Sequence, residues 1–163
     1  AEAGIPGGLD GLGAFMKVLD TRRERGFKDT LGPTPSQSVP VGAALLEAGT
    51  RNQAQLVGAP VKGPLFDFAP AIDVFLKTHL FGDSFSREDV DWQTRELATI
   101  SMLAALDVVD SQLQTHLGMS LNVGLTENQL VDFVGVLSER VNQTAAARAE
   151  EAMRRLRDGK KNG

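Results

Sequence analysis

The sequence predicts an all-α fold built around an antiparallel pair of helices. Apolar residues recur every three or four positions through most of the chain, which is the period of an amphipathic helix. No segment alternates apolar and polar residues over any length, as a half-buried strand would. Residues 91–124 hold the strongest helical pattern, first over 92–106 and again over 110–122. We therefore expect these two helices to form the centre of the fold.

The first helix of this pair carries a carboxylate on its apolar face. Two starts are present for it, a capping-box pattern at residues 86–89 and a second N-cap at Asp91. At about 100° per residue, Glu96 lies within the apolar stripe of this helix. A carboxylate in such a place must be paired, hydrogen-bonded, protonated or used in chemistry. The stripe consists of Trp92, Leu97, Ile100, Leu103 and Ala104.

The second helix places a histidine near the same level. Its apolar residues put His116 at the edge of the stripe, and Gly124 provides a stop for the helix. If the chain reverses near residues 107–109, a rise of about 1.5 Å per residue leaves Glu96 and His116 roughly 7 Å apart in height. Two side chains can span that difference. The sequence therefore predicts that Glu96 and His116 can meet across the helix pair.

Three short motifs in this region resemble the carboxymuconolactone decarboxylase family. The motifs are Arg95-Glu96-Leu97, Gln112-Leu113-x-x-His116-Leu117 and Asn122-Val123-Gly124-Leu125-Thr126. This family shares its fold with the alkylhydroperoxidase AhpD proteins, so the resemblance implies an AhpD-like helical fold over about residues 65–156. It also implies that Glu96 and His116 lie at family active-site positions.

The chain contains no cysteine, which separates it from one branch of that family. In the thiol-peroxidase branch a Cys-x-x-Cys pair precedes the histidine, and Val109 and Gln112 occupy those positions here. The peroxidase reaction of that branch is therefore not available by its usual route, and the cysteine-free decarboxylase branch fits better. Disulfides and thiolate metal sites are excluded too, while the redox compartment stays undetermined.

The activity implied by the resemblance is that of a carbon–carbon lyase. We expect a cofactor-independent decarboxylase, or a related lactone-processing enzyme of bacterial aromatic-compound catabolism, that acts on a small carboxylated ring. Such a reaction needs a group to seat the carboxylate, a donor for the developing enolate oxygen and an acid to protonate carbon. His116 is the natural proton donor, since imidazole ionises near neutral pH, and Glu96 can orient it or relay the proton.

Three further residues are candidates for substrate binding. Arg51 or Arg95 can hold a carboxylate through a bidentate contact. The alternative for Arg51 is a contact with backbone carbonyls or an acidic partner, and Arg95 can instead pair with Asp91 or with another subunit. His79 shares an apolar face of the helix predicted at residues 68–81, where it is either a hydrogen-bonded core residue or a functional one.

Other interpretations of the same residues stay open. The Glu96–His116 pair can be a structural hydrogen bond that fixes the helix register, in a non-catalytic oligomer that binds a small molecule. A further alternative is a family member with peroxiredoxin activity but without the Cys pair. No metal site is expected, because two histidines and scattered carboxylates lack a ligand spacing such as His-Glu-x-x-His. No organic cofactor is expected either.

Composition and charge restrict the partners. The 163 residues are 42% hydrophobic and 23% charged with a net charge of -4, as is usual for one soluble globular domain. Without a basic block, neither nucleic acid nor a membrane is an expected partner. We expect a homotrimer or a homohexamer, because family members bury their helix pairs against each other and the helix at 92–106 is apolar nearly all round. We expect a cytoplasmic protein, with a periplasmic one after signal-peptide removal as the alternative.

Three segments are expected along the chain. Residues 1–40 hold a helix and a Pro-rich loop, residues 41–158 the carboxymuconolactone decarboxylase-like domain, and residues 159–163 a disordered tail. The helix of the first segment is expected at residues 9–25, after a mobile start at residues 1–8.

Glycines and polar caps predict the ends of the remaining helices. Gly49 is expected to end a short helix that begins at residue 41, and Gly82 is expected to end the helix that begins at residue 68. A capping box at Thr126 and Gln129 starts the next helix. The last helix is capped by Asn142 or Thr144.

Overall fold

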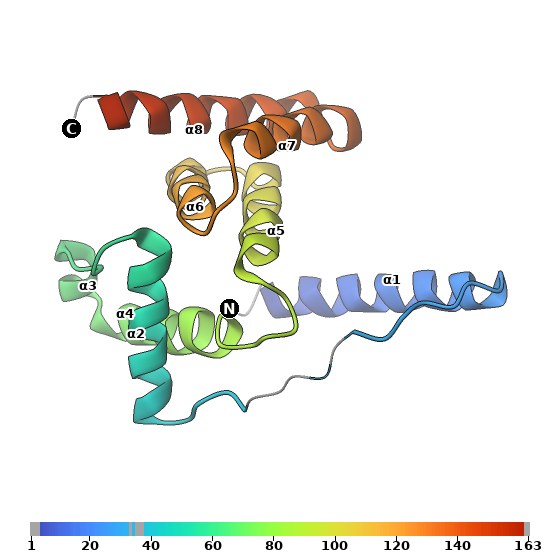
Figure 1. Cartoon of the computed structure of the whole chain (residues 1–163), viewed down its shortest axis with the longest axis horizontal. Helices are drawn as coiled ribbons and strands as arrows, with labels where there is room; N and C mark the ends of the chain where they lie inside the picture. Colours follow the sequence, from blue (N-terminus) through green and yellow to red (C-terminus); the bar gives the residue numbers. More distant parts are fainter. Residues whose placement is uncertain (1–3, 33, 35–37, 162–163) are drawn as a thin grey trace. The chain divides into compact units, whose positions relative to one another are not determined.

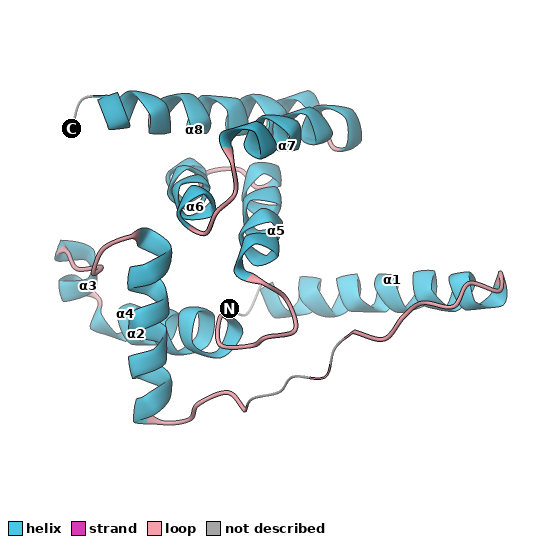
Figure 2. Ribbon diagram, in the orientation of Figure 1, coloured by secondary structure: helices cyan, strands magenta, loops and turns pink. Residues whose placement is uncertain are grey.

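The computed structural model describes residues 4–32, 34 and 38–161 and confirms the all-α prediction, since these residues form helices and no strand (Figure 2). The chain divides into two compact units, Ala1–Thr34 and Pro35–Gly163. None of the described helices is long and apolar enough to cross a membrane.

The described residues of the first unit form one helix, α1 (Gly4–Glu24). It begins earlier than the predicted residue 9, so the expected mobile start is wrong for residues 4–8, while residues 1–3 lie outside the described chain. After the helix the chain folds back, because Arg22 binds Asp29 and its guanidinium lies 4.8 Å from the centre of the Phe27 ring. The apolar side chains of α1 are 58–64% exposed at Leu9, Leu12, Phe15 and Met16.

In the second unit, α2 (Ala43–Val57) passes through Gly49 without stopping. The prediction that Gly49 ends this helix is therefore wrong. The glycine is buried where the chain at residues 77–82 comes close: a Cβ atom on Gly49 would lie only 1.6 Å from the carbonyl oxygen of Lys77. Gly49 therefore allows α2 to approach η1 closely and does not end the helix. Gly58, with a φ of 86°, ends α2 instead.

The helix predicted at residues 68–81 is three short elements. They are α3 (Pro64–Phe68), α4 (Pro70–Phe75) and the π-helix η1 (Leu76–Ser84). Pro70 opens α4, as expected of a proline in a first helical turn. Gly82 lies inside η1 and is buried against α2, where a Cβ would lie 2.9 Å from the carbonyl oxygen of Leu45, so its predicted role as a stop is also wrong.

The central helix pair is present where the sequence places it. Helix α5 (Trp92–Ala105) is capped by Asp91, whose carboxylate accepts the backbone N–H of Thr94 at 2.7 Å, so the alternative start at residues 86–89 is wrong. The chain reverses over residues 106–109, and α6 (Asp110–Asn122) packs back against α5. Val108 in this turn has a φ of 60°, a left-handed conformation that costs a β-branched residue energy.

Two further helices cover the pair. Helix α7 (Glu127–Arg140) starts with the predicted capping box of Thr126 and Gln129, and the side chain of Asn142 caps α8 (Gln143–Lys161). Helices α7 and α8 lie side by side and cover α5 and α6 (Figure 1). Because α8 runs to Lys161, the expected disordered tail is helical at residues 159–161, and residues 162–163 lie outside the described chain.

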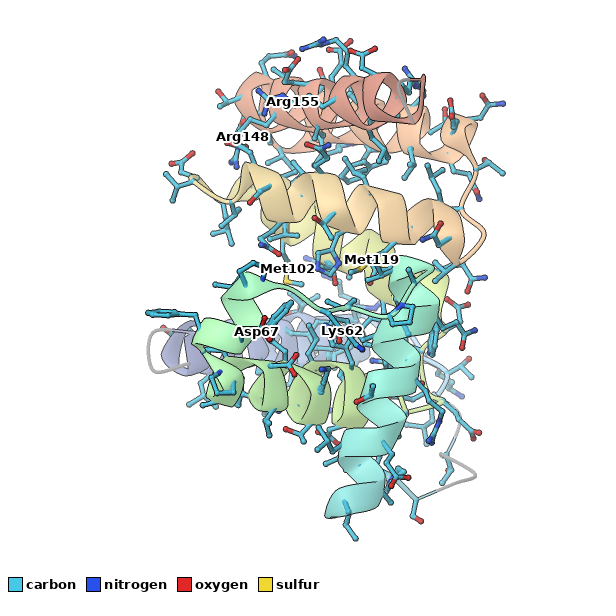
Figure 3. The ribbon with its side chains drawn as sticks, turned by 90° about the vertical axis from the view of Figure 1, so that its left-hand side faces the viewer. Lys62, Asp67, Met102, Met119, Arg148 and Arg155 are labelled. Carbon is cyan, nitrogen blue, oxygen red and sulfur yellow. The ribbon has the colours of Figure 1, made fainter. Side chains whose placement is uncertain are left out.

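Helix α6 belongs to two hydrophobic clusters. Its residues Leu113 and Leu117 pack in a cluster formed by α5, α6, α7 and α8, while Met119 packs with Leu56 of α2 and with Phe81 of η1. Figure 3 shows Met119 on the side of the helix pair that faces α3 and α4. His116 lies on α6 between these contacts, so both clusters fix the position of its backbone.

Candidate active site

The structure brings Glu96 and His116 together. Glu96 is fully buried and His116 is 9% exposed. Nδ1 of His116 lies 2.9 Å from Oε2 of Glu96, a hydrogen bond that links α5 to α6 across the turn. With Glu96 ionised, Nδ1–H is the donor, and the bond fixes both the tautomer and the orientation of the ring.

Each residue of this pair has one polar side-chain atom without a hydrogen-bond partner among the described residues. Oε1 of Glu96 is buried and has no hydrogen-bond partner among the described residues. Nε2 of His116 also has none within the described chain, although the side chain as a whole stays 11% exposed. An imidazole held through Nδ1 with Nε2 free is arranged to give or take a proton at that free edge.

Apolar residues flank the pair along both helices, and no cation of the described residues pairs with Glu96. Ile100, one turn from Glu96, and Leu113, one turn from His116, are both fully buried. In the described part of the chain, no lysine or arginine nitrogen lies within 4.0 Å of the Glu96 carboxylate. A carboxylate in such a setting interacts strongly with any charge that forms on His116, because little water is present to screen it.

The side chain of Arg95 binds the loop that precedes α5. Its guanidinium lies 2.7 Å from the carboxylate of Asp89 and donates to the carbonyl oxygens of Val90 and Arg87, at 3.0 and 3.2 Å. The acidic partner is therefore Asp89 and not the expected Asp91, because Asp91 is used to cap α5. These contacts give Arg95 a clear structural role in holding the loop.

Arg51 and His79 both lie at the surface of the chain. Arg51 is exposed and makes no hydrogen bond or ion pair with another described residue. The ring of His79 stacks on Phe75, with 5.2 Å between the ring centres. The apolar face predicted to enclose His79 is itself open, since Ile72 is 52% and Phe75 49% exposed, so the expected core position of His79 is wrong. Neither residue contacts the Glu96–His116 pair.

Sequence reasoning missed Arg148 of α8. Its side chain is 16% exposed, Nε donates to Asp110 at 2.9 Å, and Nη1 donates to the carbonyl oxygens of Leu106 and Ala104. Arg148 thus anchors α8 to the turn between α5 and α6. No local pattern in the sequence marks Arg148, because it stands at the edge of the alanine stripe of this helix, as Arg155 does seven residues later.

The described residues contain no group of three His, Cys, Asp or Glu side chains that could hold a metal ion. A cleft of about 490 Å³ lies between α6 and α8 and is lined by Arg148 and Arg155 (Figure 3). A second cleft, of about 330 Å³, is lined by residues of α5 and α7. Neither cleft is lined by Glu96 or His116.

The sequence was compared with models of known protein families. The model of the carboxymuconolactone decarboxylase family matches residues 70–155, which is more than half of the chain. The chain belongs to the carboxymuconolactone decarboxylase family. The matched region runs from α4 into α8 and includes Glu96, His116 and Arg95, whereas Arg51 lies outside it. A comparison with curated proteins gave no match.

Proposed function

We propose that this protein is a cofactor-independent decarboxylase, or a closely related lactone-processing enzyme, that acts on a small carboxylated ring by acid–base catalysis. The observation that carries the proposal is the buried hydrogen bond between Glu96 and His116, with Nε2 of His116 left unpaired. Membership of the carboxymuconolactone decarboxylase family supports the reaction class.

The proposed reaction uses the pair as one acid. The substrate carboxylate leaves as CO₂, and the electrons of the broken carbon–carbon bond move into the conjugated ring to give an enolate. Nε2–H of protonated His116 then delivers a proton to carbon, which leaves neutral imidazole. Glu96 stabilises the imidazolium before this transfer, because its carboxylate accepts the Nδ1–H bond at 2.9 Å. A proton from solvent restores His116 for the next cycle.

Turnover of carboxylated lactones by the wild-type chain and by His116→Gln tests the proposal. Gln keeps a side-chain amide that can bind Glu96 but cannot act as a proton donor of suitable strength. We expect consumption of lactone and release of CO₂ by the wild type, and loss of both in the variant with thermal unfolding little changed. Binding of such a ring without turnover by the wild type would instead support the non-catalytic alternative.

We also propose that the protein assembles as a homotrimer or a homohexamer. Residues 97–106, from the middle of α5 to its C-cap, carry no charge, yet Leu97, Met102 and Leu106 are 40%, 60% and 54% exposed in the single chain. A helix that is apolar all round is stable only when most of it is covered. Light scattering on the eluting peak of a size-exclusion column measures the mass directly, and a monomer would contradict the proposal.

A further inference from the structure

We propose that the side-chain amide of Gln53 is a further substrate-binding group of the active site, the donor that holds the oxygen on which negative charge forms. Gln53 lies on α2, outside the region that the family model matches. The inference rests on the proposed function and deepens it, because the enolate oxygen of such a reaction needs a hydrogen-bond donor.

Gln53 is one of four polar or charged side chains that are buried in the described part of the chain. The others are Glu96, His116 and Ser120, which are bonded to one another. Glu96 binds Nδ1 of His116 at 2.9 Å, and the hydroxyl of Ser120 donates to the carbonyl oxygen of His116 at 2.8 Å. Gln53 differs from all three, because it makes no hydrogen bond with another described residue.

Two neighbouring amides, by contrast, are used to hold the fold together. Asn52 donates to the carbonyl oxygen of Phe81 at 2.8 Å and so ties α2 to η1. Asn122 donates to the carbonyl oxygen of Leu56 at 3.0 Å and ties the end of α6 to the end of α2. A buried amide without such a bond weakens a fold, so the presence of Gln53 in the interior needs a reason outside these contacts.

The packing of α2 against α6 directs Gln53 towards the same interior as His116. Leu56 of α2 and Met119 of α6 belong to one hydrophobic cluster. Gln53 stands three residues before Leu56, about one turn earlier on the same side of α2. His116 stands three residues before Met119 in the same way on α6. Because Glu96 holds Nδ1, the opposite edge of the imidazole, which carries Nε2, is turned away from Glu96.

The amide of Gln53 and Nε2 of His116 are buried but not sealed. Gln53 is only 4% exposed. Its amide atoms and Nε2 are nevertheless not among the fully enclosed unpaired atoms of the described chain, so each keeps some accessible surface, whereas Oε1 of Glu96 is enclosed. In the proposed site these accessible atoms form two sides of one space. A substrate oxygen then binds the amide while a substrate carbon faces Nε2.

A neutral amide suits an oxygen whose charge grows during the reaction. The substrate oxygen carries little charge before CO₂ leaves and a negative charge in the enolate, so its bond to the N–H of Gln53 strengthens towards the transition state. Gln53 neither gains nor loses a proton. His116 delivers the proton to carbon, and the oxygen returns to its carbonyl form while still bound to the amide.

The Gln53→Met variant separates this role from a structural one. Methionine has nearly the volume of glutamine but no amide, so the urea midpoint of unfolding should stay at the wild-type value or rise. We expect kcat on a carboxylated lactone to fall by about 10²- to 10³-fold, the usual loss for one oxyanion donor. Gln55→Met removes an exposed amide from the same helix and is the matched control, with wild-type kcat expected. A clear fall in the urea midpoint of Gln53→Met would show that the fold uses the amide and would overturn the proposal.

A single cysteine tests the position of Gln53 without any turnover. The chain has no native cysteine, so Gln53→Cys and Gln55→Cys each introduce one thiol. Both are made together with His116→Gln, so that the lactone is not consumed. We expect iodoacetamide to label position 53 more slowly than position 55, and a carboxylated lactone to slow the labelling of position 53 at least tenfold without affecting position 55.

The two measurements keep the inference apart from the proposed function. If the wild type consumes lactone but Gln53→Met does so at the full rate, or if the lactone does not protect position 53, Gln53 is not part of the site and the proposed function stands. If the wild type consumes no lactone although position 53 is protected, the proposed function fails and Gln53 belongs to a non-catalytic binding site. Neither consumption nor protection would overturn both.

Discussion

Arg148 of α8 and the Glu96–His116 pair are both largely removed from solvent, and they differ in the partners that they bind. Arg148 is paired with Asp110 and donates to carbonyl oxygens at the end of α5, so its charge serves to hold the turn. Glu96 and His116 are more deeply buried but bind chiefly each other, and each keeps an unpaired atom.

The two sets of contacts distinguish a structural anchor from a candidate active site within one small protein. Burial of charge is costly in both cases. For Arg148 the cost is offset by the ion pair with Asp110 and by two backbone carbonyls, although its Nη2 makes no hydrogen bond, whereas Glu96 has only His116. A group that stays buried with an unsatisfied atom either weakens the fold or meets something outside the chain. We therefore expect stability to depend mainly on Arg148 and turnover mainly on His116.

The largest expected effect is on turnover. We expect His116→Gln to lower kcat by about 10²- to 10⁴-fold, the usual contribution of a general acid, while the free energy of unfolding changes by less than about 1.5 kcal/mol. Steady-state kinetics and urea unfolding measure the two quantities. Thr115→Ala, an exposed neighbour on α6, is the matched control and should keep both wild-type values. Equal losses of turnover in both variants would remove His116 from the mechanism.

Arg148→Met should give the opposite result. Methionine keeps the volume of the side chain in α8 but loses the bonds to Asp110 and to the carbonyl of Leu106, so the free energy of unfolding should fall by about 2 kcal/mol. The protein that remains folded should turn over substrate at close to the wild-type rate. A large drop in kcat without a drop in stability would show that Arg148 belongs to the site. It would contradict the distinction between Arg148 as an anchor and His116 as a catalytic residue.

The turn that Arg148 holds offers a smaller and opposite effect. Val108 has a φ of 60° and is 97% exposed, so Val108→Gly should relieve strain without removing packing and raise the free energy of unfolding by about 1 kcal/mol. Val109 is the matched control, because its φ of -123° suits valine and Val109→Gly should destabilise. Urea unfolding of both variants separates backbone strain from a general effect of glycine in the turn.

The smallest effect concerns pH and the start of α5. The backbone N–H of Thr94 lowers the pKa of Asp91. Because the folded value is the lower one, the stabilisation by Asp91 is complete above the unfolded pKa of about 3.9 and is lost as the pH falls through the folded pKa. Stability should therefore decline below about pH 4 less steeply in Asp91→Asn than in the wild type. Parallel acid-unfolding curves for the two proteins would argue against this contribution.

The sequence was sufficient for the helices whose limits are set by local chemistry. The capping box at Thr126 and the cap at Asp91 were readable because the bonding groups stand three residues apart. The meeting of Glu96 with His116 followed from helical rise alone, given a turn near residues 107–109. Each of these features depends on groups that are near neighbours in sequence or on a single simple reversal of the chain.

Features that depend on distant segments were not readable in this way. Gly49 looked like a helix stop, and only the approach of the Lys77 carbonyl shows why a glycine is needed inside the helix. His79 looked enclosed because its neighbours are apolar, but nothing in the spacing shows whether a helix face is covered by the same chain. The bonds of Arg148 span 38 to 44 residues, beyond any local pattern.

The contact between α2 and η1 also has a consequence for recognising relatives of this protein. A methyl group at position 49 would overlap the carbonyl of Lys77, and one at position 82 would lie 2.8 Å from the same oxygen. Evolution can therefore change the outer surfaces of these two helices freely while both positions stay without a side chain. Two glycines 33 residues apart, the first inside an α-helix and the second inside a π-helix, form a sequence signature by which this packing can be sought in other genomes.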